Sequence, residues 1–271
     1  MKPLVIYHGD CADGFTAAWC VRKKFPQAEL ISAQHQKETP PDVTERDVVI
    51  VDFSYPRAVL EDMARRANSL LVLDHHKTAQ KDLEGLPFCV FDMNRSGATM
   101  SWDHFHPDKP RPNLVKYIED RDLWRWSYNN SKEVSAAISS WPRTFEQWDE
   151  LHNQLETQLD AVIHEGAALL RSQDQLVAHI LKNAREVTFA GHKVMAVNTC
   201  TMHSEVANKL AEGRPFGLSW CQKADGKFSY SLRVSNKSLD PSLDVSAICK
   251  QINNGGGHAQ AAGCSHDNLL I

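Results

Sequence analysis

The stretch LVLDHHKTA, residues 71–79, places Asp74, His75 and His76 directly after a run of apolar residues. A strand that ends in a polar surface loop would give this pattern. A buried strand that delivers carboxylate and imidazole groups to a metal site would also give it. The tripeptide alone does not decide between the two, so the rest of the chain must be compared with it.

Two other apolar runs end in groups of the same kind: LVIY precedes His8, Asp10 and Asp13, and DVVIV precedes Asp52. Taken alone, Asp52 is more typical of a loop or cap residue, and a helix N-cap with a turn glycine explains the first group as well as a metal site does. In a parallel sheet, however, the carboxyl ends of the strands meet at one edge, where ligands bind. Crowded carboxylates take up protons unless a cation neutralises them. Aspartate with histidine suits Mn²⁺ or Mg²⁺, and two such ions can clamp a phosphate ester during hydrolysis.

The elements that would position these groups alternate along the first half of the chain. Continuous apolar strands separated by helices predict an α/β fold with a parallel sheet covered on both faces. We expect strands at 4–7, 28–33, 47–53 and 69–76, and helices at 15–25 and 56–68.

The domain organisation follows from changes in pattern. We expect an N-terminal domain over 1–142, a helical linker over 143–185 and a smaller α/β domain over 186–271. The linker is polar, lacks proline and carries periodic apolar residues. In the last domain, Asp225-Gly226 lies between two strand-like runs and predicts a hairpin.

Bulk composition restricts the classes of protein. The 271 residues carry a net charge of −4, which argues against a long nucleic acid partner and leaves a small anionic substrate open. The seven cysteines form no CxxC pair, as expected of reduced thiols. Apolar runs are too short for a membrane span, so we expect a cytoplasmic protein with no membrane partner.

Together these motifs resemble those of the DHH/DHHA1 phosphoesterases, over nearly the whole chain. The matching residues, in chain order, are His8, Asp10, Asp13 and Gly14; Asp52; Asp74, His75 and His76; Asp122; and Gly255-Gly256-Gly257-His258 with Ala259, Ala262 and Gly263. This order of five motifs is far more specific than the DHH tripeptide.

The resemblance implies a two-metal, usually Mn²⁺-dependent, hydrolase, with Mg²⁺ as the alternative. It implies that the metal ligands are His8, Asp13, Asp52, His75 and Asp122. Asp52 would bridge two ions, Asp74 would ligate an ion or orient His75, and His76 would face the scissile phosphate.

Position 11 departs from the pattern, because many relatives have aspartate where this chain has Cys11. Either Asp10 replaces that ligand, or Cys11 binds as a thiolate, or the first ion binds weakly. A thiolate would favour softer metals. We expect Asp10 to be the metal ligand that replaces this aspartate.

Further candidates concern the substrate. The glycines at 255–257, including Gly256 and Gly257, precede small residues and predict a phosphate cradle at a helix start, with His258 donating another hydrogen bond. Arg233 could bind the same phosphate, or lie on the surface of its strand. Arg95 and Ser96 could touch the substrate near the metals, although Ser96 is equally explained as an N-cap. Core packing is the default for Trp124, Trp126 and Trp141, with base stacking as the alternative.

The leading functional hypothesis is a phosphodiesterase that cleaves linear dinucleotides or very short oligonucleotides to mononucleotides. Exopolyphosphatase and nucleoside bisphosphate phosphatase activities are alternatives within the resemblance. A processive exonuclease would need a more extended basic groove. A module that senses a nucleotide without cutting it is the alternative outside enzymes, and a homodimer would be ordinary.

Overall fold

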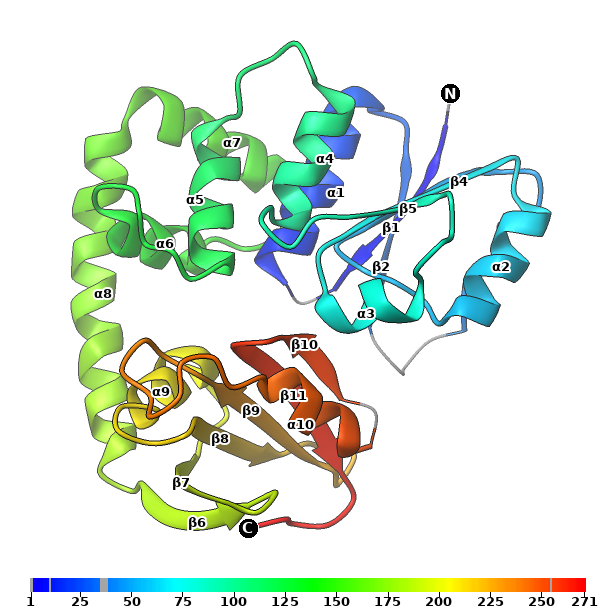
Figure 1. The fold of residues 1–271 in the computed structure, drawn as a ribbon. Helices are drawn as coiled ribbons and strands as arrows, with labels where there is room; N and C mark the ends of the chain where they lie inside the picture. Colours follow the sequence, from blue (N-terminus) through cyan, green and yellow to red (C-terminus); the bar gives the residue numbers. More distant parts are fainter. Residues whose placement is uncertain (1, 10, 35–38, 254) are drawn as a thin grey trace. The chain divides into compact units, whose positions relative to one another are not determined.

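The computed structural model describes residues 2–9, 11–34, 39–253 and 255–271. The chain divides into two compact units, residues 1–170 and 171–271, and each is built around its own sheet (Figure 1). No helix in these described ranges is long and apolar enough to cross a membrane.

The first unit begins with the alternating elements that the sequence predicts. In chain order these are β1 (Leu4–His8), α1 (Ala12–Lys24), β2 (Glu29–Ala33), β3 (Asp47–Val51), α2 (Arg57–Arg66), β4 (Ser69–Asp74), α3 (Lys77–Asp82), β5 (Cys89–Phe91) and α4 (Gly97–Phe105). Strand β5 was not predicted, since only three residues form it.

All paired strands of this sheet are parallel, in the order β2-β1-β3-β4-β5. Alternate residues of its strands face opposite sides, so the sheet is buried on both. Leu4 and Ile6 pack in a core with α2 and α3, whereas Val5 packs with α1 and α4. The predicted parallel α/β fold is therefore confirmed, and the continuous apolar strands follow from burial on both faces.

Helices complete the first unit: α5 (Asn113–Asp122), α6 (Ser131–Ser140), α7 (Phe145–Thr157) and the start of α8 (Leu159–Leu181). The segment predicted as a linker is divided differently in the structure. Trp148, Leu151 and Leu155 of α7 are buried with Trp19 of α1 in one core. Helix α7 is thus part of the first unit, and only α8 runs on into the second.

The described residues of the second unit form a mixed sheet, the end of α8 and the helices α9 and α10. Its elements after α8 are β6 (Arg185–Phe189), β7 (His192–Asn198), α9 (His203–Leu210), β8 (Gly217–Gln222), β9 (Phe228–Arg233), α10 (Val245–Gln251), β10 (Gly256–His258) and β11 (Ala261–His266). The strand order is β10-β11-β9-β8-β7-β6, and only the β7–β8 pair is parallel among the described strands. Strands β8 and β9 form the hairpin predicted from Asp225-Gly226.

Candidate metal centre

The centre of the site lies where β1 and β3 are neighbours. Strand β2 lies on one side of β1 and β3 on the other, so the chain changes direction of winding here, which is where open parallel sheets bind ligands. His8 is the last residue of β1 and Asp52 directly follows β3. Asp52 has a φ of 54°, in the left-handed region that non-glycine residues seldom adopt.

Asp52 contacts histidines from two different strands. Its Oδ1 lies 3.0 Å from Nε2 of His75, and its Oδ2 lies 3.3 Å from Nδ1 of His8. Nε2 of His75 is also 3.6 Å from a carboxylate oxygen of Asp13 and 3.6 Å from one of Asp122. The structure therefore brings together five side chains that the resemblance named, from widely separated parts of the sequence.

Asp13 is held in place by the start of helix α4. Its Oδ2 accepts a hydrogen bond from the backbone N–H of Gly97 at 2.6 Å, and its Oδ1 accepts one from that of Ala98 at 3.0 Å. Free N–H groups at a helix start stabilise a negative charge. This arrangement fixes a carboxylate that is almost completely buried.

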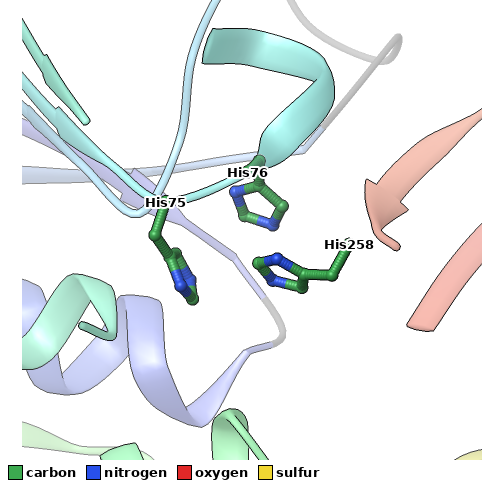
Figure 2. A group of neighbouring side chains, drawn as sticks. All are labelled: His75, His76 and His258. Carbon is green, nitrogen blue, oxygen red and sulfur yellow. The ribbon is translucent and has the colours of Figure 1, made fainter. Parts of the chain in front are cut away.

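Asp74 orients His76 rather than the ring of His75. Its Oδ1 lies 2.7 Å from Nδ1 of His76 and accepts the backbone N–H of His75, while its Oδ2 accepts the hydroxyl of Ser54. In extended chain, residues two apart lie on the same side, which explains why Asp74 meets His76. The carboxylate therefore contacts the ring of His76 and the backbone of His75, and the expectation that Asp74 ligates a metal stays a prediction. Figure 2 shows His75 and His76 directly after β4.

The buried charges act strongly on one another. Burial disfavours a charge on Asp52, but its contacts with His75 and His8 outweigh this and hold the pKa of Asp52 well below its usual range. Burial and the charge of Asp52 raise the pKa of Asp13 well above its usual range. Burial opposes a charge on His76, yet the Asp74 carboxylate raises the pKa of His76 to about 9. Close carboxylates that repel each other in this way are what a bound cation would stabilise.

Among the described residues of the first unit, two groups of side chains have the spacing of metal ligands. One is His8, Asp52 and His76, and the other is Asp13, Asp52 and His75; within each group the possible ligand atoms lie within 4.8 Å of one another. Oδ2 of Asp122 is buried and accepts no hydrogen bond from the described residues. Imidazole and carboxylate donors with an unsatisfied buried oxygen fit divalent cations, and Asp52 belongs to both groups.

The question raised by position 11 is answered only in part. Asp10 lies outside the described residues. Cys11 stands at the N-cap of α1, and burial, together with the charges of Asp52, Asp122 and Asp13, raises the pKa of its thiol well above the usual range. The choice between Asp10 and Cys11 as the ligand stays a prediction.

Gly97 is a site residue that the sequence did not reveal. A Cβ at this position would come within 2.5 Å of Cβ of Asp52 and 3.0 Å of Oδ2 of Asp13. Helix α4 can therefore approach the site only with glycine here. The available signal was the succession Ser96-Gly97 before a helix, which indicates an N-cap but not this close approach.

Arg95 and Ser96 have structural partners. The Arg95 guanidinium binds Asp92 at 2.7 Å and Asp103 at 3.0 Å. The Ser96 hydroxyl accepts the backbone N–H of Thr99, which makes it the N-cap of α4. Of the two interpretations of Ser96, the cap is therefore confirmed, while a role of Arg95 with substrate stays a prediction.

The glycine-rich motif of the second unit does not start a helix. Gly256, Gly257 and His258 form strand β10, which pairs antiparallel with β11. Gly257 has a φ of 135°, and a Cβ there would lie 2.6 Å from the carbonyl oxygen of Ala261. The predicted helix-start cradle was wrong, because the glycines allow a close hairpin.

Arg233 lies at the end of β9 in the same unit. Its guanidinium donates hydrogen bonds to the carbonyl oxygen of Leu232 and to Oγ of Ser204, both at 2.8 Å. These neutral partners fix the position of the group, and its binding to a substrate phosphate stays a prediction.

Comparisons with known proteins identify the fold. No family model matches the chain. An uncharacterised protein of Acanthamoeba polyphaga mimivirus, R106, is 28% identical over 289 residues, which cover 98% of this chain and 68% of that protein. The crystal structure of an uncharacterised Helicobacter pylori G27 protein aligns over 99% of this chain and 94% of its own, with a TM-score of 0.50 and 16% identity.

The chain is also similar in structure to RecJ. RecJ from Thermus thermophilus, in complex with Mn²⁺, aligns over 98% of this chain and 50% of its own length, with a TM-score of 0.52 and 14% identity. The present chain, with a parallel-sheet unit followed by a smaller mixed-sheet unit, is therefore similar in fold to half of this RecJ chain.

Proposed function

We propose that this chain is a DHH-family phosphoesterase that uses two divalent cations to hydrolyse linear dinucleotides or very short oligonucleotides to mononucleotides. The observation that supports this most is the position of Asp52, which is shared by two groups with the spacing of metal ligands. A carboxylate common to two ions is the arrangement that two-metal phosphoesterases need.

The residues that would hold the ions are His8, Asp52 and His76 in one group and Asp13, Asp52 and His75 in the other, with Oδ2 of Asp122 beside His75. When bound, divalent ions supply a Lewis acid for the phosphoryl group and lower the pKa of water. The crystal structure of RecJ, which has a similar fold, was solved in complex with Mn²⁺. Mn²⁺ is therefore the first ion to test and Mg²⁺ the second.

The chain's own groups have separate tasks around that chemistry. Asp74 accepts a hydrogen bond from Nδ1 of His76 and fixes the orientation in which this ring would meet either an ion or a phosphoryl oxygen. Asp13 is prevented from moving by the N–H groups of Gly97 and Ala98. Such fixed groups avoid reorganisation during the reaction.

A substrate panel tests the proposal. The purified chain is incubated with Mn²⁺ and, separately, a 5′-phosphorylated dinucleotide, a long single strand, polyphosphate and a nucleoside bisphosphate. We expect mononucleotide release from the dinucleotide, abolished by a chelator and by Asp52→Asn, but retained by the exposed control Asp108→Asn. If product formed only from polyphosphate or only from the bisphosphate, that compound would be the substrate class instead of the dinucleotide. Tight nucleotide binding without any product would contradict the enzyme hypothesis and favour a nucleotide sensor.

A further inference from the structure

The segment that follows Asp122 combines aromatic and cationic side chains. The guanidinium carbon of Arg121 lies 4.3 Å from the ring centre of Trp124 and 5.6 Å from that of Trp126. Nζ of Lys132, from the first turn of α6, lies 5.7 Å from the ring centre of Trp126. The two tryptophan rings meet edge to face, with centres 5.1 Å apart. We call Arg121, Trp124, Trp126 and Lys132 the tryptophan–cation cluster.

The backbone of this cluster is strained. Trp124 has a φ of 55° and Trp126 a φ of 54°. For bulky residues the left-handed region is costly, and such strain persists only where the surrounding structure imposes it. Both rings are only partly buried, so core packing does not by itself explain them.

Two buried or partly buried acids impose this conformation. Asp120 accepts the backbone N–H groups of Ser127 and Tyr128 and the hydroxyls of Ser127 and Ser131. Glu119 accepts from Arg125, whose guanidinium also donates to the carbonyl oxygen of Asn94. The segment is thus fixed at both ends instead of forming a loose turn.

The cluster lies beside the candidate metal centre within the first unit. Arg121 directly precedes Asp122, and the Cα atom of Trp124 is at most about 7 Å from that of Asp122, because two residues span no more than that. The metal centre itself carries mainly negative groups, so cations at its edge would offset the charge of an approaching phosphate. Nucleobases stack on aromatic rings and on guanidinium planes.

We propose that the tryptophan–cation cluster is a nucleotide-binding subsite, in which a nucleobase stacks on one of the two tryptophan rings, the other ring supports it edge to face, and Arg121 and Lys132 bind the adjoining phosphate. This inference rests on the proposed function and adds to it that the substrate is recognised through a base as well as through its phosphates. It assigns no base preference, since stacking is tolerant of sequence.

Two substrates with the same phosphodiester separate base recognition from catalysis. One is a 5′-phosphorylated dinucleotide, and the other is its analogue in which one base is absent. We expect Trp124→Ala and Trp126→Ala to raise KM for the dinucleotide by about tenfold, the range that loss of one stacked base gives, with kcat nearly unchanged. For the abasic analogue, the variants and the wild type should have equal KM.

Three further measurements keep the test decisive. Trp126→Phe should restore most of the affinity, and Trp141→Ala, which removes a partly buried tryptophan packed on the helical core, should leave the ratio of the two KM values unchanged. An equal rise in KM for both substrates in the alanine variants would show a structural role and overturn the inference. Should the alanine variants fail to fold, Trp124→Leu and Trp126→Leu, which keep an apolar side chain but lose the aromatic ring, answer the same question: KM should rise for the dinucleotide and stay equal to that of the wild type for the abasic analogue.

The outcome for the subsite can be separated from that for the function. A methylphosphonate-linked dinucleotide measures binding without turnover. If the chain cleaves none of the substrates but binds this analogue in a way that depends on Trp124, the subsite is supported and the hydrolase activity is contradicted. Cleavage that is indifferent to the presence of the base would keep the hydrolase and overturn the subsite.

Discussion

The two sheets of the chain position their polar groups by different means. In the first unit, β1, β3 and β4 run parallel, and the residues at their ends meet at Asp52. In the second unit, Arg233 lies on β9, between antiparallel neighbours, opposite Gly217 on one side and Ala261 on the other. Gly217 lets the backbone of α9 approach the sheet closely, and Ser204 of α9 accepts a hydrogen bond from the Arg233 guanidinium. The direction of the strands brings together the residues around Asp52. The register of the strands sets the neighbours of Arg233.

The electrostatic character of the two regions differs as well. The first concentrates buried carboxylates whose charges shift one another's pKa values, and it fits divalent cations. In the second, the Arg233 guanidinium donates hydrogen bonds to a neutral carbonyl oxygen and a neutral hydroxyl oxygen. We therefore expect activity to respond to every change of charge in the first region. Substitutions in the second region should affect substrate affinity more than the chemical step.

The largest effect should follow from removing the shared carboxylate. Asp52→Asn should lower kcat/KM for the dinucleotide by roughly 10³-fold or more, because both candidate ion sites lose a ligand. Calorimetric titration with Mn²⁺ should show the loss of metal binding in the same variant. Full Mn²⁺ affinity in Asp52→Asn would contradict the shared site.

Gly97→Ala should have the next largest effect. The added Cβ would displace Asp52, and a displacement of about 1 Å can cost roughly 10²-fold in rate. The matched control is Gly263→Ala in the second sheet, where the nearest atom, the carbonyl oxygen of Tyr230, would be 3.4 Å from the new Cβ. Steady-state kinetics of both variants test the comparison, and equal rates would show that α4 tolerates the extra carbon.

Arg233→Ala tests the second region. If its guanidinium binds a substrate phosphate, the loss of this charged donor should raise KM by about tenfold and leave kcat close to that of the wild type. Arg214→Ala removes an arginine of the same unit that pairs with Glu186 at 2.6 Å, and it should leave KM unchanged. A fall in kcat with constant KM would assign Arg233 to the chemical step instead.

The smallest effect concerns Asp103, which holds Arg95 and Arg111. Burial opposes its charge, but hydrogen bonds from the two arginines keep the pKa of Asp103 below its usual value. Its stabilising contribution is therefore present above the unfolded pKa of about 3.9 and is lost as the pH falls through the lower folded value.

Asp103→Asn should accordingly lower the free energy of unfolding by about 1 kcal/mol at pH 7, measured by urea denaturation, with the difference shrinking below about pH 4. Turnover should be nearly unchanged. A large fall in kcat would instead support the earlier expectation that Arg95 touches the substrate.

Much of the first unit could be predicted because local and long-range signals agree there. Each apolar run is followed by an acid or a histidine, and parallel strands bring such ends together, so the grouping of His8, Asp52 and His75 followed from the sequence pattern. Asp122 followed only from the resemblance, since nothing local distinguishes a helix-end aspartate that reaches the site.

Other features depend on distances that a sequence does not contain. The partner of Asp74 is set by side-chain direction over two residues, and the need for glycine at position 97 by the approach of α4 to Asp52. The glycines before His258 serve a hairpin, although the same residues are typical of a helix start. Leu151 and Leu155 had the periodicity of a helix, but periodicity does not reveal which core a helix joins.

The hydrogen bonds from Gly97 and Ala98 to the Asp13 carboxylate link backbone amides to the candidate metal centre. Exchange of these two amide protons with deuterium requires the helix start to separate from the carboxylate. Addition of Mn²⁺ should therefore slow their exchange, and this protection gives a residue-specific signal of ion binding that needs no substrate.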